Sequence, residues 1–569
     1  MSKALQRDGA VSMLADVDPV TLTVIEKGLQ QVCTEMDLVH EKTSFSPIIS
    51  EAYDRANGIY HREDGRMIAQ GELGLPIFLG QLAVTTNTVI RTRDDLVDGD
   101  IVIMNDPYLG GSHLMDVRMI RPFYYNGRLW AYLSNVGHWR DTGGVVPGGF
   151  TTRSTEIHQE GLRIPPIKLV KAGEMQDDVL QLILNNIRVP NDSLGDVKAQ
   201  IAALSAGAKR LTALLDRYGE NLVDQAIAEL EVRSERLMRS HIETIPDGVW
   251  SAVAHVDSDG IVNEPLTIRV NLQVSGSDMQ VDFAGSSAPC AGPLNTVWAT
   301  TLSAVYIALK HIFPDVPMNA GCFRPIQVEE PRGTFLYAEY PSPTAGSAAE
   351  VSQRIIEAIL LALAPAIPDR IFAPPAGTSG NLSLGGVDPL TGENYVMYYF
   401  SGGGYGGWYD GDGISNGCAT IGISKTQPVE VLELRYPVIF EHYSLREDSG
   451  GAGKYRGGLG VDYRMKLLRG TATASFMMDH GRQGPPGTLG GLPGAANEIV
   501  VSRDGQAEIP EHISKGEGYV MRPGDWIDVK TPGGGGYGDP CERDCGRIAK
   551  DEKSGYLART SSFMPSPGE

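Results

Sequence analysis

The chain has little cysteine and no long apolar segment. Its six cysteines form neither a CxxC pair nor the spacing of a secreted framework, which excludes a disulfide scaffold. The longest apolar run lies near Ile359–Ile367, contains Pro365 and is too short to span a bilayer. Residues 1–16 lack the apolar core of a signal peptide. We therefore expect a protein of the reducing cytoplasm.

Basic sequence runs are also missing. The 49 lysines and arginines face 70 acidic residues, which gives a net charge of −21. Without a basic surface that releases counterions, the chain is a poor candidate for binding nucleic acid or an anionic membrane. Its 42% apolar and 21% charged residues are ordinary for a globular protein, which excludes collagen, coiled coils and wholesale disorder.

The glycine-rich segments contain no recognisable nucleotide site. Gly402–Gly407 matches GxGxxG, but Trp408–Gly413 cannot open the helix that a dinucleotide fingerprint needs. In 450–455, Lys454 is followed by tyrosine instead of the Ser or Thr of a phosphate loop. Because close backbone approach requires missing side chains, the loops 402–407 and 533–538 are instead expected to form subunit contacts.

The residue patterns predict a multi-domain α+β protein. A helix is expected to begin at Asp18-Pro19, where an N-cap acceptor precedes proline. Two further helical patterns cover 193–218 and 221–242, and alternation over 249–284 predicts strands. We divide the chain into a flexible leader (1–17), an N-terminal domain with the candidate site (18–245), a central mixed α/β region (246–394), a β-rich region (395–540) and a flexible tail (541–569).

Asn126-Gly127 predicts a β-hairpin between two strands rich in β-branched and aromatic residues. Counting back from this turn, Tyr125 opposes Arg128, so that Met115 opposes His138 and Asp116 opposes Gly137. This register puts Asp116 and His138 on opposite faces. A shared metal site would need a bulge or a turn out of the strand, which the glycines at 110, 111, 137, 143 and 144 make feasible.

Metal-ligating side chains gather at one end of this hairpin. His113 and Asp116 precede the first strand, and His138 and Asp141 follow the second. Two imidazoles with carboxylates form a mixed N/O set that suits Zn²⁺, Mn²⁺ or Fe²⁺. The alternative is that they are buried polar residues that satisfy loop backbone. Asp54, beside a predicted strand, is a candidate for a further ligand.

Other polar residues are less specific. His158 and Glu160 lie in a predicted loop and are either general acid/base groups or ordinary loop residues. We interpret His311, His442 and His480 as core or surface residues.

Several blocks of the chain, from about residue 18 to 540, resemble the hydantoinase B family. These blocks are Asn105–Tyr108, Gly110–His113 with Asp116, Gly137-His138 with Asp141–Gly144, Glu160–Pro166, Gly321–Ile326, Pro428–Glu430 with Leu432-Glu433, Arg435–Pro437, Asp448–Gly453 and Thr531–Pro540.

The resemblance implies a two-subunit enzyme. A hydantoinase A-type partner binds ATP and phosphorylates an enolate or amide oxygen, while the B-type chain carries a divalent metal. The family's ligand positions fall on His113, Asp116 and His138, with Asp54 at the position of an additional carboxylate. Trp139 departs from the pattern, because many hydantoinase-like members have a second histidine there.

Three functions follow as hypotheses. The first is a metal-binding subunit of an ATP-dependent hydrolase of cyclic amides, in which Asp141 orients His138 or acts as a base. The second is a subunit of an ATP-dependent ketone carboxylase of the acetone or acetophenone type, which uses bicarbonate. The third is a scaffold with a vestigial site. In each enzyme the chain is expected in a hetero-oligomer, such as an α2β2 assembly.

Overall fold

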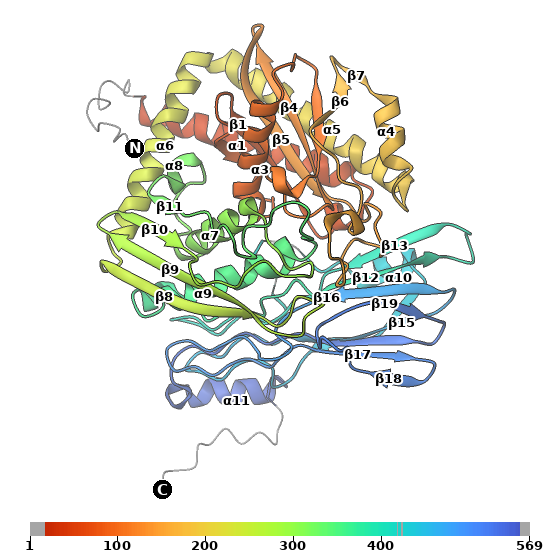
Figure 1. The fold of residues 1–569 in the computed structure, drawn as a ribbon. Coiled ribbons are helices and arrows are strands. Elements are labelled where there is room, and N and C mark those ends of the chain that lie inside the picture. Colours follow the sequence, from red (N-terminus) through yellow and green to blue (C-terminus); the bar gives the residue numbers. More distant parts are fainter. Residues whose placement is uncertain (1–16, 418, 423–424, 558–569) are drawn as a thin grey trace.

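The computed structural model describes residues 17–417, 419–422 and 425–557. Its first sheet has seven strands in the order β2-β1-β5-β4-β3-β6-β7, and all neighbours are antiparallel (Figure 1). The strands are β1 (Arg55–His61), β2 (Met67–Gln70), β3 (Ile101–Met104), β4 (Asp116–Tyr125), β5 (Arg128–His138), β6 (Ile167–Lys171) and β7 (Glu174–Met175).

Helices cover both faces of this sheet. The first helix starts where predicted, because the Asp18 carboxylate accepts hydrogen bonds from the N–H groups of Val20 and Thr21. α1 and α5 pack on one face, and α3, backed by α7, covers the other. The helices of four or more residues are α1 (Pro19–Thr43), α2 (Pro47–Ser50), α3 (Phe78–Thr92), α4 (Asp177–Leu184), α5 (Pro190–Tyr218), α6 (Glu220–Ile242), α7 (Trp298–Ile312), α8 (Ala320–Phe323), the π-helix η3 (Ser347–Val351), α9 (Ser352–Leu363), α10 (Val429–Arg435) and α11 (Cys545–Lys553).

Three further sheets follow along the chain. The second, in the order β11-β10-β9-β8, packs against α9. The other two share one apolar core and form the β-rich region at lower right in Figure 1. β12 lies within the predicted central region but pairs with β13 and β16 of the β-rich region. The strands are β8 (Gly248–Val256), β9 (Leu266–Ser275), β10 (Asp278–Asp282), β11 (Ile326–Val328), β12 (Asn381–Val387), β13 (Asn394–Tyr399), β14 (Val438–Leu445), β15 (Val461–Leu467), β16 (Ala472–Met477), β17 (Glu498–Arg503), β18 (Gln506–Glu508), β19 (Lys515–Met521) and β20 (Trp526–Lys530).

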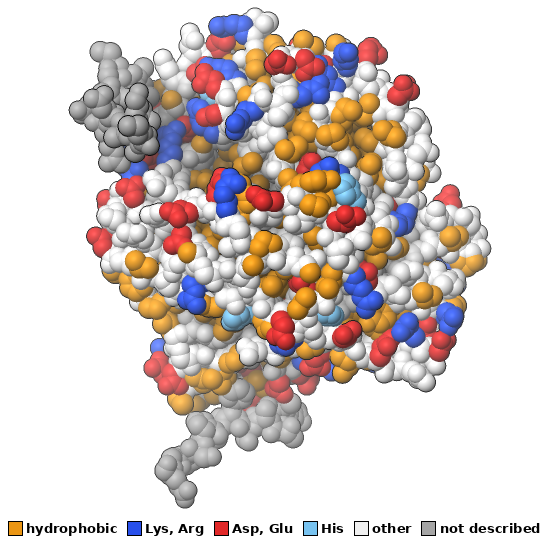
Figure 2. All heavy atoms as spheres, viewed as in Figure 1, with side chains coloured by type: hydrophobic (Ala, Val, Ile, Leu, Met, Phe, Trp, Pro, Cys, Tyr) orange, Lys and Arg blue, Asp and Glu red, His pale blue; other side chains and the backbone are white. Residues whose placement is uncertain are grey.

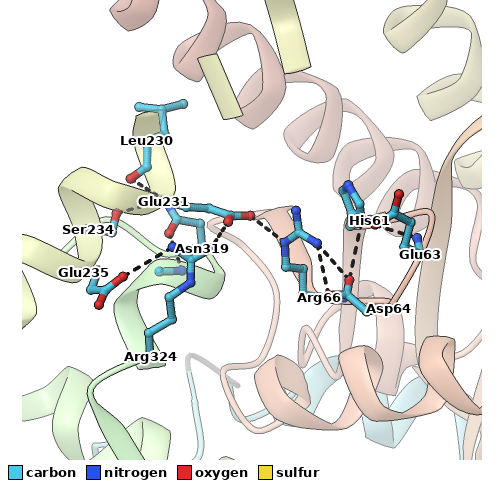
Figure 3. A network of polar contacts seen from close by, with 11 residues as sticks. His61, Glu63, Asp64, Arg66, Leu230, Glu231, Ser234, Glu235, Asn319 and Arg324 are labelled. Atoms are coloured by element: carbon cyan, nitrogen blue, oxygen red, sulfur yellow. Dashed lines mark hydrogen bonds and ion pairs between the residues drawn. The ribbon is translucent and has the colours of Figure 1, made fainter. Parts of the chain in front are cut away.

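A buried carboxylate ties the first sheet to the second part of the chain. Glu231 of α6 accepts a hydrogen bond from Arg66, in the turn between β1 and β2, with Nε to Oε1 at 2.9 Å (Figure 3). Its other oxygen pairs with Arg324, just after α8. The glutamate side chain is only 3% exposed, so two cations compensate one buried charge.

The glycine-rich loops pack against one another inside the chain. A Cβ at Gly406 would lie 1.6 Å from the carbonyl oxygen of Ala373, and one at Gly457 would lie 1.9 Å from that of Gly534. Backbone hydrogen bonds join the loops, as from Gly407 N–H to Gly535 O at 2.9 Å. The expectation of subunit contacts at 402–407 and 533–538 is therefore corrected: the close approach is internal.

Neither charge sign dominates the visible surface, and a helix lies near the carboxyl end of the described chain. Acidic and basic side chains are interspersed over the face seen in Figure 2. No helix in the described ranges is both long and apolar enough to cross a membrane. Within the expected flexible tail, α11 forms a helix whose Asp551 pairs with Arg456 and Arg543. Residues 1–16 of the expected leader and 558–569 of the tail lie outside the described residues.

Candidate metal centre

The predicted hairpin is confirmed, but its register differs from the expected one. Asn126 and Gly127 have φ values of 50° and 76°, and Tyr125 opposes Arg128 as predicted. The register then shifts between Phe123 and Tyr124, where β5 contributes one extra residue. Asp116 therefore opposes His138 directly, not Gly137. The bulge lies beside the turn rather than at the glycines of the far end.

This shift brings the ligand candidates together on the α3 face of the sheet. His138 Nδ1 lies 3.2 Å from Asp116 Oδ1, and His113 Nε2 lies 3.1 Å from Asp116 Oδ2. The ligand atoms of these three residues all lie within 4.8 Å of one another. Asp54 lies at the edge of this cluster, with its Oδ2 3.6 Å from His138 Nδ1. It is held there because β1 pairs with β5 and the backbone N–H of His138 donates to the carbonyl oxygen of Asp54. All four side chains are buried.

A distant segment fixes the orientation of His113. Its Nδ1 donates to the carbonyl oxygen of Ala345 at 3.1 Å, which leaves Nε2 facing Asp116. The Glu160 carboxylate accepts hydrogen bonds from the N–H groups of Thr344 and Ala345 and from the Ser154 hydroxyl, at 2.9–3.1 Å. Burial raises the pKa of Glu160 to about 7 against these hydrogen bonds. Glu160 is thus linked to His113 through one residue, Ala345, whose N–H binds the glutamate and whose carbonyl oxygen binds the histidine.

Further groups support the other ligands and were not found from the sequence. The Ser112 hydroxyl donates to Asp116, and the buried Arg118 donates to the Asp116 carbonyl oxygen at 2.7 Å. The His138 ring stacks on Tyr398 and Phe150, with ring centroids 5.1 and 5.9 Å apart. Ser112 and Arg118 flank the ligand motif and were within reach of sequence reasoning, whereas no local signal marks Tyr398.

The cluster has uneven protonation preferences. Burial raises the pKa of Asp54 well above its usual value, and the neighbouring Asp116 charge adds to the rise. Burial acts in the same direction on Asp116, but His113 and the hydrogen bonds from both imidazoles hold its pKa well below the usual value. Burial lowers the pKa of His138, which favours the neutral imidazole that ligates metals.

These residues fit a divalent metal ion. His113 Nε2, His138 Nδ1 and the carboxylates of Asp116 and Asp54 form a buried nitrogen and oxygen donor set of the kind that holds Zn²⁺, Mn²⁺ or Fe²⁺. The carboxylates of Asp54 and Asp116 are buried side by side and repel each other. A cation at this position would offset that repulsion.

The remaining sequence candidates lie away from this cluster. The Asp141 carboxylate accepts hydrogen bonds from Arg188 N and Nη1, both at 2.8 Å, and from the N–H groups of Gly143 and Gly148. His158 is exposed and pairs with the Tyr340 hydroxyl at 2.9 Å.

Trp139 lies in the core on the α1 and α5 face of the sheet and donates to Gln200. Position 139 therefore faces away from His138.

A second group of three possible ligands lies in the β-rich region. His442, Asp462 and Asp528 are half-buried on β14, β15 and β20. Arg464 pairs with Asp528 at 2.7 Å and thereby neutralises one of the two carboxylates. His480 is buried, and His311 and His442 are part-exposed.

Comparison with known proteins shows the family to which the chain belongs. The family model described as hydantoinase B/oxoprolinase matches residues 18–540. The caprolactamase subunit beta of Pseudomonas jessenii is 34% identical over 95% of this chain and 94% of its own length. The crystal structure of ATP-dependent caprolactamase from that organism superposes with a TM-score of 0.88 at 31% identity, covering 95% of each chain. An acetone carboxylase structure also has a TM-score of 0.88, at 19% identity over 96% of this chain and 79% of that one, which shows a shared fold. The chain belongs to the hydantoinase B/oxoprolinase family.

Proposed function

We propose that this chain is the metal-binding B-type subunit of an ATP-dependent hydrolase of cyclic amides. Its substrate is a hydantoin-, lactam- or oxoproline-type ring whose carbonyl oxygen has been phosphorylated by an A-type partner subunit. The observation that carries the proposal is the buried cluster of His113, Asp116 and His138 with Asp54 at its edge, in a chain 34% identical to a caprolactamase subunit.

Each side chain has a defined task in this proposal. His113, Asp116, His138 and Asp54 would hold a divalent ion, which when bound supplies Lewis-acid activation of a water molecule. Glu160, through the 344–345 backbone, holds His113 in one tautomer and orientation. Its contacts therefore support a positioning role rather than the acid/base role considered from the sequence. Tyr398 and Phe150 flank His138 and exclude bulk water.

The reaction would consume two waters for each phosphorylated ring. The oxygen of the first water bonds to the former carbonyl carbon, the ring C–N bond breaks, and the nitrogen takes up a proton, which leaves an acyl phosphate. The second water converts the acyl phosphate into a carboxylate and inorganic phosphate, so that a lactam yields an amino acid. The absence of a phosphate loop from the sequence supports assigning ATP to the partner, in a hetero-oligomer such as α2β2.

The carboxylase and scaffold hypotheses have less support. The likeness to acetone carboxylase is at 19% identity and concerns the fold, whereas the caprolactamase likeness is at 31–34%. A vestigial site would not need four buried candidate ligands with supporting hydrogen bonds.

The deciding experiment combines the purified chain with its A-type partner, ATP and a divalent metal. We expect a cyclic amide to be opened in fixed proportion to the ATP consumed. Label from bicarbonate appearing in an acid product would select the carboxylase instead. The hydrolase assignment is wrong if no ring opens with any lactam, hydantoin or oxoproline.

A further inference from the structure

Two cavities adjoin at the candidate metal centre. The inner one, about 20 Å³, is lined by the four candidate ligands. The outer one, about 310 Å³, is lined, among the described residues, by Ser379, by 400–402, and by Asn416, Gly417, Ala419, Lys425 and Thr426. Ser379 and Phe400 line both cavities. The outer cavity, whose volume is typical of a small-molecule site, is therefore a space from which a compound can reach the centre.

The inner cavity has mainly apolar walls. Apart from the ligands, its lining includes Leu75, Ile77, Phe78, Phe150, Phe400 and Ile421. Among the described residues that line it there is no lysine or arginine. The carboxylates of Asp54 and Asp116 would already offset the charge of a divalent ion in this cavity, so a ring that bears its own carboxylate would bury a further, unpaired charge, which is strongly unfavourable. The walls suit an uncharged ring, and they must move to admit it, because 20 Å³ holds about one water molecule.

The outer cavity is polar and contains one cation. Ser401, Asn416 and Thr426 contribute neutral polar groups, and Lys425 is the cationic residue of the described lining. Lysine binds phosphate as a point charge, assisted by neutral donors around it.

Lys425 is also tied to the segment that carries a candidate ligand. Its N–H donates to the Ala52 carbonyl oxygen at 3.0 Å, and its ammonium lies 4.4 Å from the ring centroid of Tyr53. Tyr53 has a φ of 64°, a left-handed conformation that is rare for an aromatic residue, and Asp54 follows directly. The outer cation and the inner carboxylate are thus held by one short stretch of backbone.

We propose that the two cavities divide one activated substrate between them: the inner cavity takes an uncharged ring, and Lys425 in the outer cavity takes its phosphoryl group. The inference rests on the proposed function, and it narrows the substrate to rings without a carboxylate. The activated substrate is an apolar ring that carries a phosphate dianion. Its two parts match the apolar inner cavity and the outer cavity that contains Lys425. Lys425 then holds the phosphoryl group while the ring carbon faces His113 and His138.

The test is a calorimetric titration of the full-length chain, freed of metal so that no ion can hold the probe. The probes are cyclohexylphosphonate, inorganic phosphate and 4-phosphonocyclohexanecarboxylate, whose ring carries a carboxylate in addition to the phosphonate. We expect cyclohexylphosphonate to bind tightest, and Lys425→Ala to weaken it about ten- to hundredfold. Lys425→Arg should retain most of the affinity. Lys454→Ala is the matched control, since Lys454 pairs with Glu542 outside both cavities.

The outcomes separate this inference from the proposed function. Equal cyclohexylphosphonate affinity in the wild type and Lys425→Ala, or no cyclohexylphosphonate binding by the wild type, overturns the two-compartment site even if the complex opens cyclic amides. Binding of 4-phosphonocyclohexanecarboxylate as tightly as cyclohexylphosphonate overturns the exclusion of carboxylate-bearing rings. If the complex opens no cyclic amide, the proposed function is refuted. The affinities measured by calorimetry are independent of that result, so the two failures can be told apart.

Discussion

Asp116 and His138 are direct cross-strand partners because β5 carries one residue more than β4 between the turn and the site. In a hairpin without this extra residue the two side chains would point to opposite faces, since side chains alternate along a strand. The bulge places both on the α3 face, 3.2 Å apart. It is therefore the local feature that makes a shared site possible.

Glu160→Gln should weaken metal binding about ten- to hundredfold, the usual effect of losing a group that orients a ligand. The Glu160 carboxylate accepts hydrogen bonds from the N–H groups of Thr344 and Ala345. Its replacement should make the backbone of Ala345 more mobile, and with it the carbonyl oxygen that binds His113. Competitive metal titration measures the change. Glu156→Gln, an exposed neighbour, should leave affinity unaltered. Unchanged affinity in Glu160→Gln would remove the positioning role.

Asp141→Asn should lower stability more than metal affinity. The buried carboxylate pairs with Arg188 at 2.8 Å and holds two glycine N–H groups, so we expect a loss of about 1–3 kcal/mol in urea unfolding. Metal affinity should stay within about threefold, because Asp141 does not contact the ligands. The exposed Asp178→Asn serves as control. A collapse of metal affinity at full stability would restore the role of Asp141 as an orienter of His138.

Glu357 should make folding stability fall with rising pH. Burial and the charges of Asp479 and Asp257 raise its pKa from 4.5 to about 7, against the attraction of Arg354. The folded state therefore keeps a proton that the unfolded chain has released. The stabilisation is complete below pH 4.5 and is lost as pH rises through 7, by up to about 3 kcal/mol.

Glu357→Gln lacks this titration. Urea unfolding at several pH values should show the wild type losing stability relative to Glu357→Gln between pH 4.5 and 7. His480, whose Nε2 lies 3.1 Å from Glu357, stays neutral in this range, because burial lowers its pKa to about 3. Glu243→Gln, at an exposed site, should track the wild type. Parallel curves for the wild type and Glu357→Gln would contradict the raised pKa.

Glu231→Gln should destabilise the fold by about 1–3 kcal/mol, since it leaves two part-exposed arginines without their shared carboxylate (Figure 3). Glu229→Gln disrupts a more exposed pair on the same helix, with Arg233, and should cost less than about 0.5 kcal/mol. Urea unfolding compares the two variants. Equal losses of unfolding free energy in the two variants would mean that burial of the Glu231 carboxylate does not increase its contribution to stability.

Local signals in the sequence predicted much of the fold. Asp18-Pro19 and Asn126-Gly127 are short-range signals, and the helix start and the turn follow them. The bulge was not predictable in this way, because the residues around Leu129 and Trp130 are ordinary strand formers.

Long-range contacts explain what the sequence left open at the site. The link from Glu160 to Thr344 and Ala345 spans more than 180 residues, and Tyr398 reaches His138 from the β-rich region. The glycines of 402–407 were recognised as sites of close approach, but their partners in the same chain were not.

The metal content of three purified proteins tests the central claim most directly. Elemental analysis of the wild type should find about one divalent ion per chain, and His138→Ala should lose most of it, since one of three or four ligands is removed. His442→Ala, in the second group of possible ligands, should keep the wild-type content. Full metal in His138→Ala, or loss of metal only in His442→Ala, would contradict the assignment of the centre to His113, Asp116, His138 and Asp54.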